Sequence, residues 1–369
     1  MKTVVVFYGG KSVEHDVSII TGVMTANCLG DSEYQSLPVY IDKSGAWYTG
    51  ESLLDPDGYK NLNFKNLKRV TLTGGSNVLF EIKRGKLRPL ATVSVAINCM
   101  HGGFGEDGSL AGLLNFCGIP VASPPVLPAA VSMDKSFTKT ALKGLKVKAL
   151  PSITVSSIKE WQTAKEKIAY PVIVKPTLLG SSIGISRAEN FVELERAISY
   201  GLRFCSSVII ESCLEDFTEI NCAAYLKKDG TIAVSECERP VGRTKILSFN
   251  DKYEGGKRVF PADIDKKYSD KIKEITKKVY RELGFSGVIR IDYFLSNGQI
   301  YLNEINSVPG SLAYYLFGDT LYSFSKMLKE LIAVAEQKFA KCGTVTTDYK
   351  SGILNGVGSK GAKGRSNRL

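Results

Sequence analysis

Three side chains that carry oxygen ligands lie on two adjoining strand-like segments in the last third of the chain. Asp292 lies in VIRIDYF, and Glu304 and Asn306 lie in IYLNEIN. Mg²⁺ takes oxygen ligands in octahedral geometry, usually one or two carboxylates together with substrate phosphates. The three residues therefore predict a magnesium site, although a surface hairpin with polar outward positions explains them equally well.

The turn between these segments, Ser296-Asn297-Gly298, decides whether the three side chains can meet. A three-residue loop with Gly298 in the left-handed conformation places even-numbered residues of one strand opposite even-numbered residues of the other. Arg290 and the three oxygen-bearing side chains would then share one face of the sheet. A two-residue Asn-Gly turn would send them to opposite faces, so we expect the three-residue loop.

A second segment that could bind a charged ligand is KPTLLGSSIG, in which Lys175 ends an apolar strand and a Gly-Ser loop follows. Backbone N–H groups in such a loop can surround a phosphate, and the lysine ammonium would neutralise its charge. The segment is not a Walker motif, because no helix-opening GK[ST] is present. A flexible connector is the alternative interpretation.

Three further loops carry polar residues beside glycines. Glu14 follows the first strand and comes just before a helix, where it could face a ligand ammonium or act as N-terminal helix charge; from the residues alone we favour the helix role. His101 opens HGGFGEDGS, between a buried strand and a helix, where open α/β sheets bind ligands, although a tight turn also explains its glycines. Lys252 and Tyr253 occupy a long polar loop at 243–261, which reads as a mobile lid or a solvated excursion.

Length and composition limit the number of domains and the kind of protein that this chain can form. A chain of 369 residues suggests two or three domains, and no apolar run approaches the roughly 20 residues that span a bilayer. The N-terminus, MKTVVVFYGG, reads as a first buried strand rather than a signal peptide, so we expect a cytoplasmic protein that does not enter the membrane. The eight cysteines form no CxxC pair and read as reduced core residues.

The excess of positive charge invites a nucleic-acid hypothesis. The chain has 48 basic and 37 acidic residues, a net charge of +11. Five of the basic residues lie after Asp348, in a glycine-rich end that lacks the apolar residues needed to fold. No stripe of aromatic and basic residues appears elsewhere. We therefore expect a disordered tail and no nucleic-acid partner, and the charge suits a nucleotide polyphosphate substrate.

Strands and helices alternate in three blocks before this tail. The pattern predicts a multidomain α/β and α+β protein with a parallel, doubly wound sheet in the first block. We place the domains at 1–127, 128–213 and 214–343, with the basic tail at 344–369. The closing helix has apolar residues at helical spacing, which predicts core packing for Leu321, Phe324, Leu328, Leu331, Ile332, Ala335 and Phe339. Strands are expected at 3–10, 94–98, 170–176, 207–212, 220–226, 231–238, 288–294 and 300–306, and helices at 17–28, 109–118, from 134, and at 190–201, 266–283 and 321–339.

Taken in order, the motifs EHDVS, HGGFGEDG, MDKSFTK, VIVKPTLLGSSIG, IIESCLEDFTEI, DKY, VIRIDYF and NEINSVPG make the chain resemble the D-alanine–D-alanine ligases of the ATP-grasp superfamily, from Lys2 to Phe317. The resemblance implies a pre-ATP-grasp N-terminal domain and ATP held between two α+β lobes. It implies ligation of two D-alanines through an acylphosphate, for peptidoglycan synthesis and hence cell wall biogenesis and cell shape. The resemblance also implies two bound Mg²⁺ ions, which Mn²⁺ could replace, and a homodimer.

The resemblance also implies roles for individual residues, with Glu304 bridging the two metal ions. Metal ligands would be Asp292, Glu304 and Asn306, and the catalytic groups would be Glu14, Ser181, Tyr253, Arg290 and Gly310. ATP would be bound by Lys135, Lys175, Ser181, Ser182, Glu211, Leu214, Glu219 and Lys252. The amino-acid substrates would contact Glu14, His101, Tyr315 and Leu316.

The sequence departs from the family pattern after Pro309-Gly310. The usual Ser-Leu pair, whose serine holds the second substrate's carboxylate, is replaced by Tyr315 and Leu316. A phenol can donate the same hydrogen bond from a bulkier side chain. D-Alanine is the expected acceptor, and D-serine, D-lactate or another amino acid are the alternatives. A non-catalytic nucleotide-binding homologue is a further alternative, although no metal ligand or phosphate lysine is missing.

Overall fold

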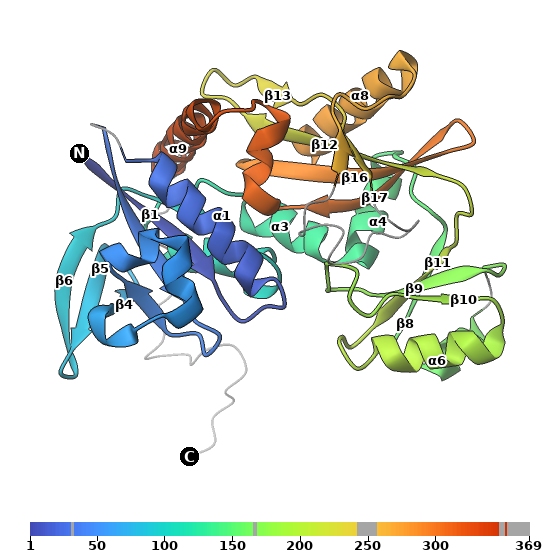
Figure 1. Ribbon diagram of the computed structural model, residues 1–369, viewed down its shortest axis with the longest axis horizontal. Coiled ribbons are helices and arrows are strands. Elements are labelled where there is room, and N and C mark those ends of the chain that lie inside the picture. Colours follow the sequence, from blue (N-terminus) through green and yellow to red (C-terminus); the bar gives the residue numbers. More distant parts are fainter. Residues whose placement is uncertain (31–32, 165–167, 242–256, 347–350, 353–369) are drawn as a thin grey trace.

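The computed structural model describes residues 1–30, 33–164, 168–241, 257–346 and 351–352. Three main sheets lie along the length of the molecule, with helices packed on their faces (Figure 1). Each main sheet draws its strands from one of the three predicted blocks. The loop residues Lys252 and Tyr253, and the tail beyond residue 352, lie outside the described residues. No helix in the described part of the chain is long and apolar enough to cross a membrane.

The N-terminal sheet has seven strands in the order β6-β5-β4-β3-β2-β1-β7. Strand β1 pairs in parallel with β2 and β7, and the pairs from β2 outward to β6 are antiparallel. The predicted parallel sheet is therefore the core of a mixed sheet. Its strands are β1 (Lys2–Gly9), β2 (Tyr34–Ile41), β3 (Trp47–Thr49), β4 (Lys68–Thr73), β5 (Ser76–Lys83), β6 (Lys86–Thr92) and β7 (Val95–Asn98).

Helices cover both faces of this sheet, as the doubly wound prediction required. Alternate residues of β1 point to opposite faces. Val4 and Val6 pack with α1 (His15–Cys28) and α9 (Leu321–Gly343), and Val5 and Phe7 pack against α2 (Ser109–Phe116). Short 3₁₀ turns lie at Glu51–Leu54, Pro56–Asn61, Phe64–Asn66 and Gly103–Gly105.

The second sheet has four antiparallel strands in the order β10-β9-β11-β8. Its apolar face packs on α5 and α6 around Trp161, which is buried. Two helices, α3 and α4, precede it in the chain. The elements are α3 (Val126–Met133), α4 (Lys135–Gly144), β8 (Ser152–Val155), α5 (Ile158–Thr163), β9 (Val172–Pro176), β10 (Ser186–Ala188), α6 (Phe191–Gly201) and β11 (Val208–Ser212).

The third sheet is also four-stranded and antiparallel, in the order β13-β12-β16-β17. Helix α8 packs on one face of it, and a two-stranded sheet of β14 and β15 borders the undescribed residues 242–256. The elements are β12 (Thr218–Leu226), β13 (Ile232–Val234), β14 (Arg239–Val241), β15 (Lys257–Val259), α8 (Lys266–Glu282), β16 (Val288–Ser296), β17 (Gln299–Asn306) and a 3₁₀ turn at Gly310–Leu316.

The turn between β16 and β17 differs from the prediction. Ser296 pairs with Gln299, so the loop has two residues, Asn297 and Gly298, both with positive φ. This is the hairpin geometry in which Asn-Gly is favoured. A register shift between Asp292 and Tyr293 then adds one residue to β17, so that Asp292 lies opposite Glu304. The loop prediction was wrong, but the bulge restores the same-face arrangement that the loop was meant to explain.

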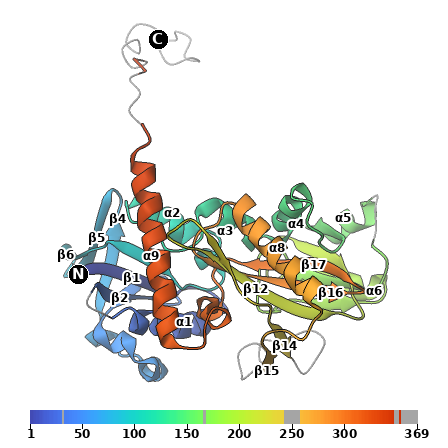
Figure 2. The ribbon, with the colours of Figure 1, turned by 90° about the horizontal axis from the view of Figure 1, so that it is seen from above.

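Helix α9 runs alongside both the N-terminal sheet and the third sheet (Figure 2). Five residues of the predicted stripe are buried, namely Phe324, Leu328, Leu331, Ile332 and Ala335. The two ends of the stripe are wrong as core residues, because Leu321 and Phe339 are 59% and 41% exposed. The helix continues beyond the sheets at its C-terminal end, where little remains for Phe339 to pack against.

Phe324 offers a test of this packing, because its side chain is fully buried in the core that joins α1, α9 and the third sheet. Phe324→Ala should lower the free energy of unfolding by about 3–5 kcal/mol through lost contacts and a cavity. Leu321→Ala, on the same helix but exposed, should change it by less than about 0.5 kcal/mol. Urea denaturation followed by circular dichroism measures both. Equal effects would show that α9 is not anchored through Phe324.

All eight cysteines are described, and none forms a disulfide. Cys99, Cys117, Cys222 and Cys237 are buried, Cys28, Cys205 and Cys213 are half-buried, and Cys342 is exposed. The prediction of free thiols is confirmed, and that of core positions holds fully for the four buried residues.

Candidate active site

Two adjoining cavities lie where the second and third sheets and the N-terminal loops meet. The inter-sheet cavity has about 810 Å³ of empty space, part of it open to solvent, and is lined by residues of both four-stranded sheets, among them Ile173 and Phe294. The polar cavity has about 1410 Å³ of empty space, part of it open to solvent, and is lined by N-terminal loops, the third sheet and the β14–β15 pair. Gly180, Glu219 and Glu304 line both cavities. The two cavities therefore share a boundary.

The third sheet presents a row of polar side chains to these cavities. Asn221 of β12 is directly opposite Asp292 of β16, which is opposite Glu304 of β17. Arg290 and Asn306 form the next cross-strand pair. Directly opposed residues of antiparallel strands project to the same face. The prediction that the metal-ligand candidates and Arg290 share a face is therefore confirmed.

Hydrogen bonds fix this group tightly. The Arg290 guanidinium donates from Nε and Nη2 to the two carboxylate oxygens of Asp292, at 2.7 and 3.0 Å. Asn306 Nδ2 donates to Asp292 Oδ2 at 3.0 Å. Asp292 is buried, whereas Arg290 and Asn306 line the polar cavity above it. A two-point contact of this kind holds the guanidinium in one orientation.

The candidate metal ligands suit a hard cation in their chemistry. Two carboxylates and an amide oxygen are the donors that Mg²⁺ takes, with phosphate or water completing the octahedron. Within the described ranges, no group of three or more His, Cys, Asp or Glu side chains is arranged to hold a metal ion. The predicted set depends on the Asn306 amide and on ligands from a substrate. Arg290 would have to share Asp292 with the cation.

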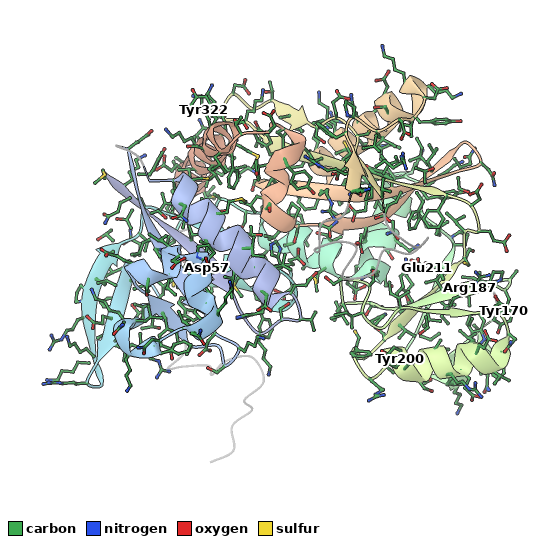
Figure 3. All side chains as sticks on the ribbon, viewed as in Figure 1. Asp57, Tyr170, Arg187, Tyr200, Glu211 and Tyr322 are labelled. Carbon is green, nitrogen blue, oxygen red and sulfur yellow. The ribbon has the colours of Figure 1, made fainter. Side chains whose placement is uncertain are left out.

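A buried carboxylate between two lysines marks the inter-sheet cavity. Glu211 of β11 lies in the region between the two four-stranded sheets (Figure 3), with Lys175 Nζ at 2.7 Å and Lys139 Nζ at 2.9 Å. Burial alone would raise the pKa of Glu211, but the two ammonium groups hold it below its usual range. Burial lowers the pKa of Lys139. Lys175 also donates to Asn303 Oδ1 at 3.1 Å and lines the cavity, where it can meet an anionic ligand.

The Gly-Ser loop lies between the two cavities and is held from both sides. Lys135 Nζ donates to the Leu179 carbonyl at 2.7 Å, and the Ser181 hydroxyl donates to the Glu14 carboxylate. Ser181 and Ser182 both have positive φ, which costs roughly 1–2 kcal/mol per residue. Backbone strain of this kind concentrates at functional sites. These contacts and the positive φ values favour a positioned loop over a flexible connector.

His101 links the N-terminal domain to the segment that follows β17. Its Nδ1 contacts the Val308 carbonyl at 2.7 Å, and its Nε2 contacts Thr21 Oγ1 at 2.8 Å. Thr21 Oγ1 in turn accepts the Ser311 N–H at 3.0 Å. Burial lowers the pKa of His101 to about 4, so the imidazole is neutral near pH 7. His101 therefore orients the Gly310 region rather than carrying charge there.

Glu106 is a half-buried carboxylate to which the sequence interpretation gave no role. It accepts the Gly102 N–H at 3.1 Å and the Val308 N–H at 3.3 Å, so it joins two loops of the polar cavity. Burial, reinforced by the nearby charge of Glu14, raises the pKa of Glu106 to about 8. The carboxyl group is therefore largely protonated at neutral pH.

This raised pKa predicts a pH-dependent stability. The folded protein binds the Glu106 proton more tightly than the unfolded chain does, so its contribution is complete below the ordinary pKa of 4.5 and is lost as pH rises through about 8. Glu106→Gln cannot ionise. The Tm of the variant minus that of the wild type should therefore grow from about pH 4.5 to about pH 8 and then level off. Thermal unfolding over a pH series measures the difference, and a constant difference would contradict the assignment.

The structure brings most of the predicted residues together. The inter-sheet cavity is lined by Lys135, Lys175, Ser182, Glu211, Leu214, Glu219 and Glu304, and the polar cavity by Glu14, His101, Ser181, Arg290, Asn306, Gly310 and Tyr315. Asp292 lies beneath Arg290 and Asn306. Leu316 is the exception, because its side chain is buried in the core that contains α9. Only its backbone remains for a substrate.

The sequence interpretation missed residues that the structure places at the site. Lys139 lies four residues after Lys135 on α4, a spacing that puts both on one helix face and could have indicated it. Asn303 occupies the register shift of β17, which no local pattern announces. Glu238 and Arg258 line the polar cavity, Glu238 from the residue before β14 and Arg258 from the middle of β15. The sequence interpretation placed Glu238 at the end of an expected strand and Arg258 in the long polar loop, and it gave neither residue a role.

Two four-stranded antiparallel sheets with a lysine-lined cavity between them, attached to a doubly wound N-terminal domain, define the ATP-grasp class of fold. Models of the N-terminus and the C-terminus of D-Ala D-Ala ligase match residues 3–124 and 142–333. The chain belongs to the D-alanine–D-alanine ligase family, whose members are ADP-forming, ATP-dependent ligases.

Individual relatives agree with this assignment over nearly the whole chain. The D-alanine–D-alanine ligase of Thermosipho melanesiensis is 33% identical, covering 94% of this chain and 97% of that protein. The D-alanine–D-alanine ligase of Thermosipho africanus is 35% identical, covering 92% and 94%. Among solved structures, the VanG D-Ala:D-Ser ligase from Enterococcus faecalis superposes with a TM-score of 0.78 at 27% identity, covering 90% of this chain and 99% of that chain. The D-alanine–D-alanine ligase from Helicobacter pylori gives 0.74 at 29% identity, covering 90% and 98%.

Proposed function

We propose that this protein joins two D-alanine molecules to D-alanyl-D-alanine with hydrolysis of ATP to ADP and phosphate, the step that supplies a dipeptide for peptidoglycan precursors. The family membership supports this reaction, since the relatives of 33% and 35% identity are D-alanine–D-alanine ligases. The observation that carries it is the continuity of the two cavities at Glu304, Glu219 and Gly180, which gives a nucleotide and an amino acid a shared boundary.

The first step activates the donor carboxylate, which is a poor acylating group by itself. The γ-phosphoryl group of ATP passes to a carboxylate oxygen of the first D-alanine, and ADP leaves. We assign ATP to the inter-sheet cavity, with Lys135 and Lys175 at its phosphates and Glu211, Leu214 and Glu219 at its nucleoside end. Charge neutralisation and positioning are the main contributions that a protein makes to phosphoryl transfer.

The donor amino acid belongs in the polar cavity under this proposal. The Glu14 carboxylate, held by the Ser181 hydroxyl, would bind its ammonium group. Neutral His101 would fix the loop that carries Gly310 beside it. Lys252 and Tyr253 remain assigned to the lid by the resemblance, and they lie outside the described residues.

In the second step the acceptor amine attacks the acylphosphate carbonyl carbon, and negative charge develops on the carbonyl oxygen. The C–O bond to phosphate then breaks, phosphate leaves with the bonding electrons, and the nitrogen loses its proton to the leaving phosphate or to water. Arg290, oriented by Asp292, and the Gly310 N–H line the polar cavity and would stabilise that oxygen. Preorganised donors aimed at developing charge are usually the largest catalytic contribution.

We assign Asp292, Glu304 and Asn306 to the binding of Mg²⁺, with Mn²⁺ as a substitute. When bound, the cation would neutralise the negative charge of the phosphates. The residues themselves contribute a fixed set of oxygen donors at the boundary of the two cavities. We also propose that the enzyme works in the cytoplasm, where ATP is available. A homodimer and the domain boundaries stay predictions.

Phosphate release from purified protein with ATP, Mg²⁺ and a panel of D- and L-amino acids tests the proposal, with product masses read afterwards. We expect turnover with D-alanine and a product with the mass of D-alanyl-D-alanine. A mixed product with D-serine or D-lactate would move the acceptor assignment to those compounds. Absence of ADP formation with every amino acid would overturn the proposed function in favour of a non-catalytic nucleotide-binding homologue.

A further inference from the structure

The polar cavity contains a carboxylate, Glu238, that takes no part in the reaction described above. Its backbone exchanges two hydrogen bonds with Asn221 of β12, at 2.8 and 2.9 Å. Residues paired in this way are directly opposed and project to the same face. Glu238 therefore extends the polar row of the third sheet, beyond Asn221 and on the side away from Asp292 and Glu304.

Glu238 is buried but weakly paired. Its residue exposure is 4%, yet its side-chain contacts with the described residues are long: Asn221 Nδ2 donates to Oε2 at 3.3 Å and Arg258 Nη1 donates to Oε1 at 3.4 Å. Strong charge-assisted hydrogen bonds are roughly 2.7–2.9 Å long. A buried carboxylate without close partners is costly. A cationic group entering the cavity would remove that cost.

Asn221 gives a second, independent indication that the row is not complete. Its Oδ1 atom is buried and has no hydrogen-bond partner in the described part of the protein. A buried acceptor left without a donor is uncommon in folded proteins and calls for a functional explanation. Both residues line the polar cavity. The wall that they form therefore offers the cavity a hydrogen-bond acceptor, Asn221 Oδ1, to which no described group donates.

Arg258 supplies the opposite charge beside Glu238. Its guanidinium carbon lies 4.7 Å from the centre of the Tyr315 ring and 5.6 Å from that of Phe260, so aromatic side chains help to orient it. The Arg258 side chain is 40% exposed and lines the polar cavity. A planar guanidinium is suited to a carboxylate. Tyr315, the residue at which the sequence departs from the family pattern, thus supports a cation.

The two charges match the two ends of an amino acid. An α-amino acid carries its ammonium and carboxylate on one carbon, and Glu238 Oε1 and Arg258 Nη1 are 3.4 Å apart. Under the proposed function, on which this inference rests, Glu14 is assigned to the donor ammonium, Glu219 to the ribose and Glu304 to the metal. We infer that Glu238 binds the ammonium and Arg258 the carboxylate of the acceptor, so that the enzyme selects an α-amino acid over a hydroxy acid.

Competition between acceptors tests this inference, because the products compared arise from one acylphosphate. Purified protein is given ATP, Mg²⁺ and D-alanine together with either D-lactate, which lacks the ammonium, or D-alaninamide, which lacks the carboxylate. Mass spectrometry gives the ratio of each mixed product to D-alanyl-D-alanine. Changes in donor binding or phosphoryl transfer cancel in this ratio. The wild type should form the dipeptide in large excess over both mixed products.

We expect Glu238→Gln to raise the D-lactate product ratio about tenfold or more, and Arg258→Gln to raise the D-alaninamide ratio similarly, because each loses one charged contact. Glu238→Asp should restore part of the discrimination. Glu236→Gln is the matched control, since Glu236 pairs with Lys273 at the surface and does not line the cavity. Its ratios should equal those of the wild type.

The possible outcomes distinguish a failure of the proposed function from a failure of the acceptor site. A wild-type protein that forms no dipeptide overturns the proposed function. If the wild-type protein forms the dipeptide but the product ratios of the Glu238 and Arg258 variants stay within about twofold of the wild-type ratios, only the acceptor site is overturned. Arg258→Gln keeps the test decisive if Glu238→Gln does not fold, because the Arg258 side chain is the more exposed of the two.

Discussion

Lys175→Ala should lower ATP-dependent phosphate release with D-alanine at least about a hundredfold, because a preorganised charge at the transferring phosphate is removed. Lys175 Nζ lies in the inter-sheet cavity, where Glu211 and Asn303 hold it in place. The lysine is therefore already ordered before a nucleotide binds. Phosphate release measures the effect, and calorimetric titration with ATP shows how much of it arises from weaker nucleotide binding.

Lys139→Ala is the matched control for this substitution. Lys139 contacts the same Glu211 carboxylate at 2.9 Å, yet it does not line the inter-sheet cavity. Both variants leave Glu211 with one lysine, so both should lose stability through the weakened buried ion pair. Only Lys175→Ala should lose most of the activity. Equal losses of activity in the two variants would mean that Lys175 acts through the ion pair and not on the phosphates.

The sequence predicted the regular elements of the fold well where hydrophobic periodicity was strong. The strand at Val172–Pro176 and the helix at Lys266–Glu282 lie close to their predicted positions. The antiparallel strands between Trp47 and Thr92 were not predicted, because their exposed and half-buried residues give a weak alternating pattern. These strands extend the parallel core of the N-terminal sheet without changing the helices that cover it.

In the hairpin of the third sheet, the prediction that the side chains share a face was correct, although the turn predicted to explain it was wrong. The Asn297-Gly298 dipeptide carries the local signal for a two-residue turn, and the structure follows it. The side chains share a face because of the register shift at Asp292 and Tyr293, which tertiary packing determines. Local sequence could predict the turn but not the bulge, so it could not identify Asn303 as a partner of Lys175.

The remaining site residues depend on contacts between distant segments. Glu106 contacts Val308 across 202 positions of the chain, and Glu14 meets Ser181 across 167. The resemblance to the family indicated Glu14 and Ser181, since their motifs are recognisable. Glu106 lay within a recognised motif but received no role, because its contact with the distant Val308 is not visible in the sequence. Glu238 and Arg258 belonged to none of the motifs.

Glu304→Gln should lower phosphate release about a hundredfold or more and should raise the Mg²⁺ concentration needed for half-maximal rate. The Glu304 side chain is the metal-ligand candidate that lines both cavities, opposite Asp292 in the cross-strand row. Glutamine keeps the size of the side chain and removes its charge, so the variant should still fold. A chelator should abolish the wild-type activity, and added Mg²⁺ or Mn²⁺ should restore it.

The Mg²⁺ dependence distinguishes metal binding from a general loss of active-site order. Asn306→Ala should shift the Mg²⁺ midpoint in the same direction but less, because an amide oxygen is a weaker ligand than a carboxylate and because Asn306 also donates to Asp292. Glu330→Gln, a charge removal on α9 outside both cavities, should leave the midpoint unchanged. If Glu304→Gln lost activity while its Mg²⁺ midpoint equalled that of the wild type, Glu304 would act on the substrates directly and the metal site would have to lie elsewhere.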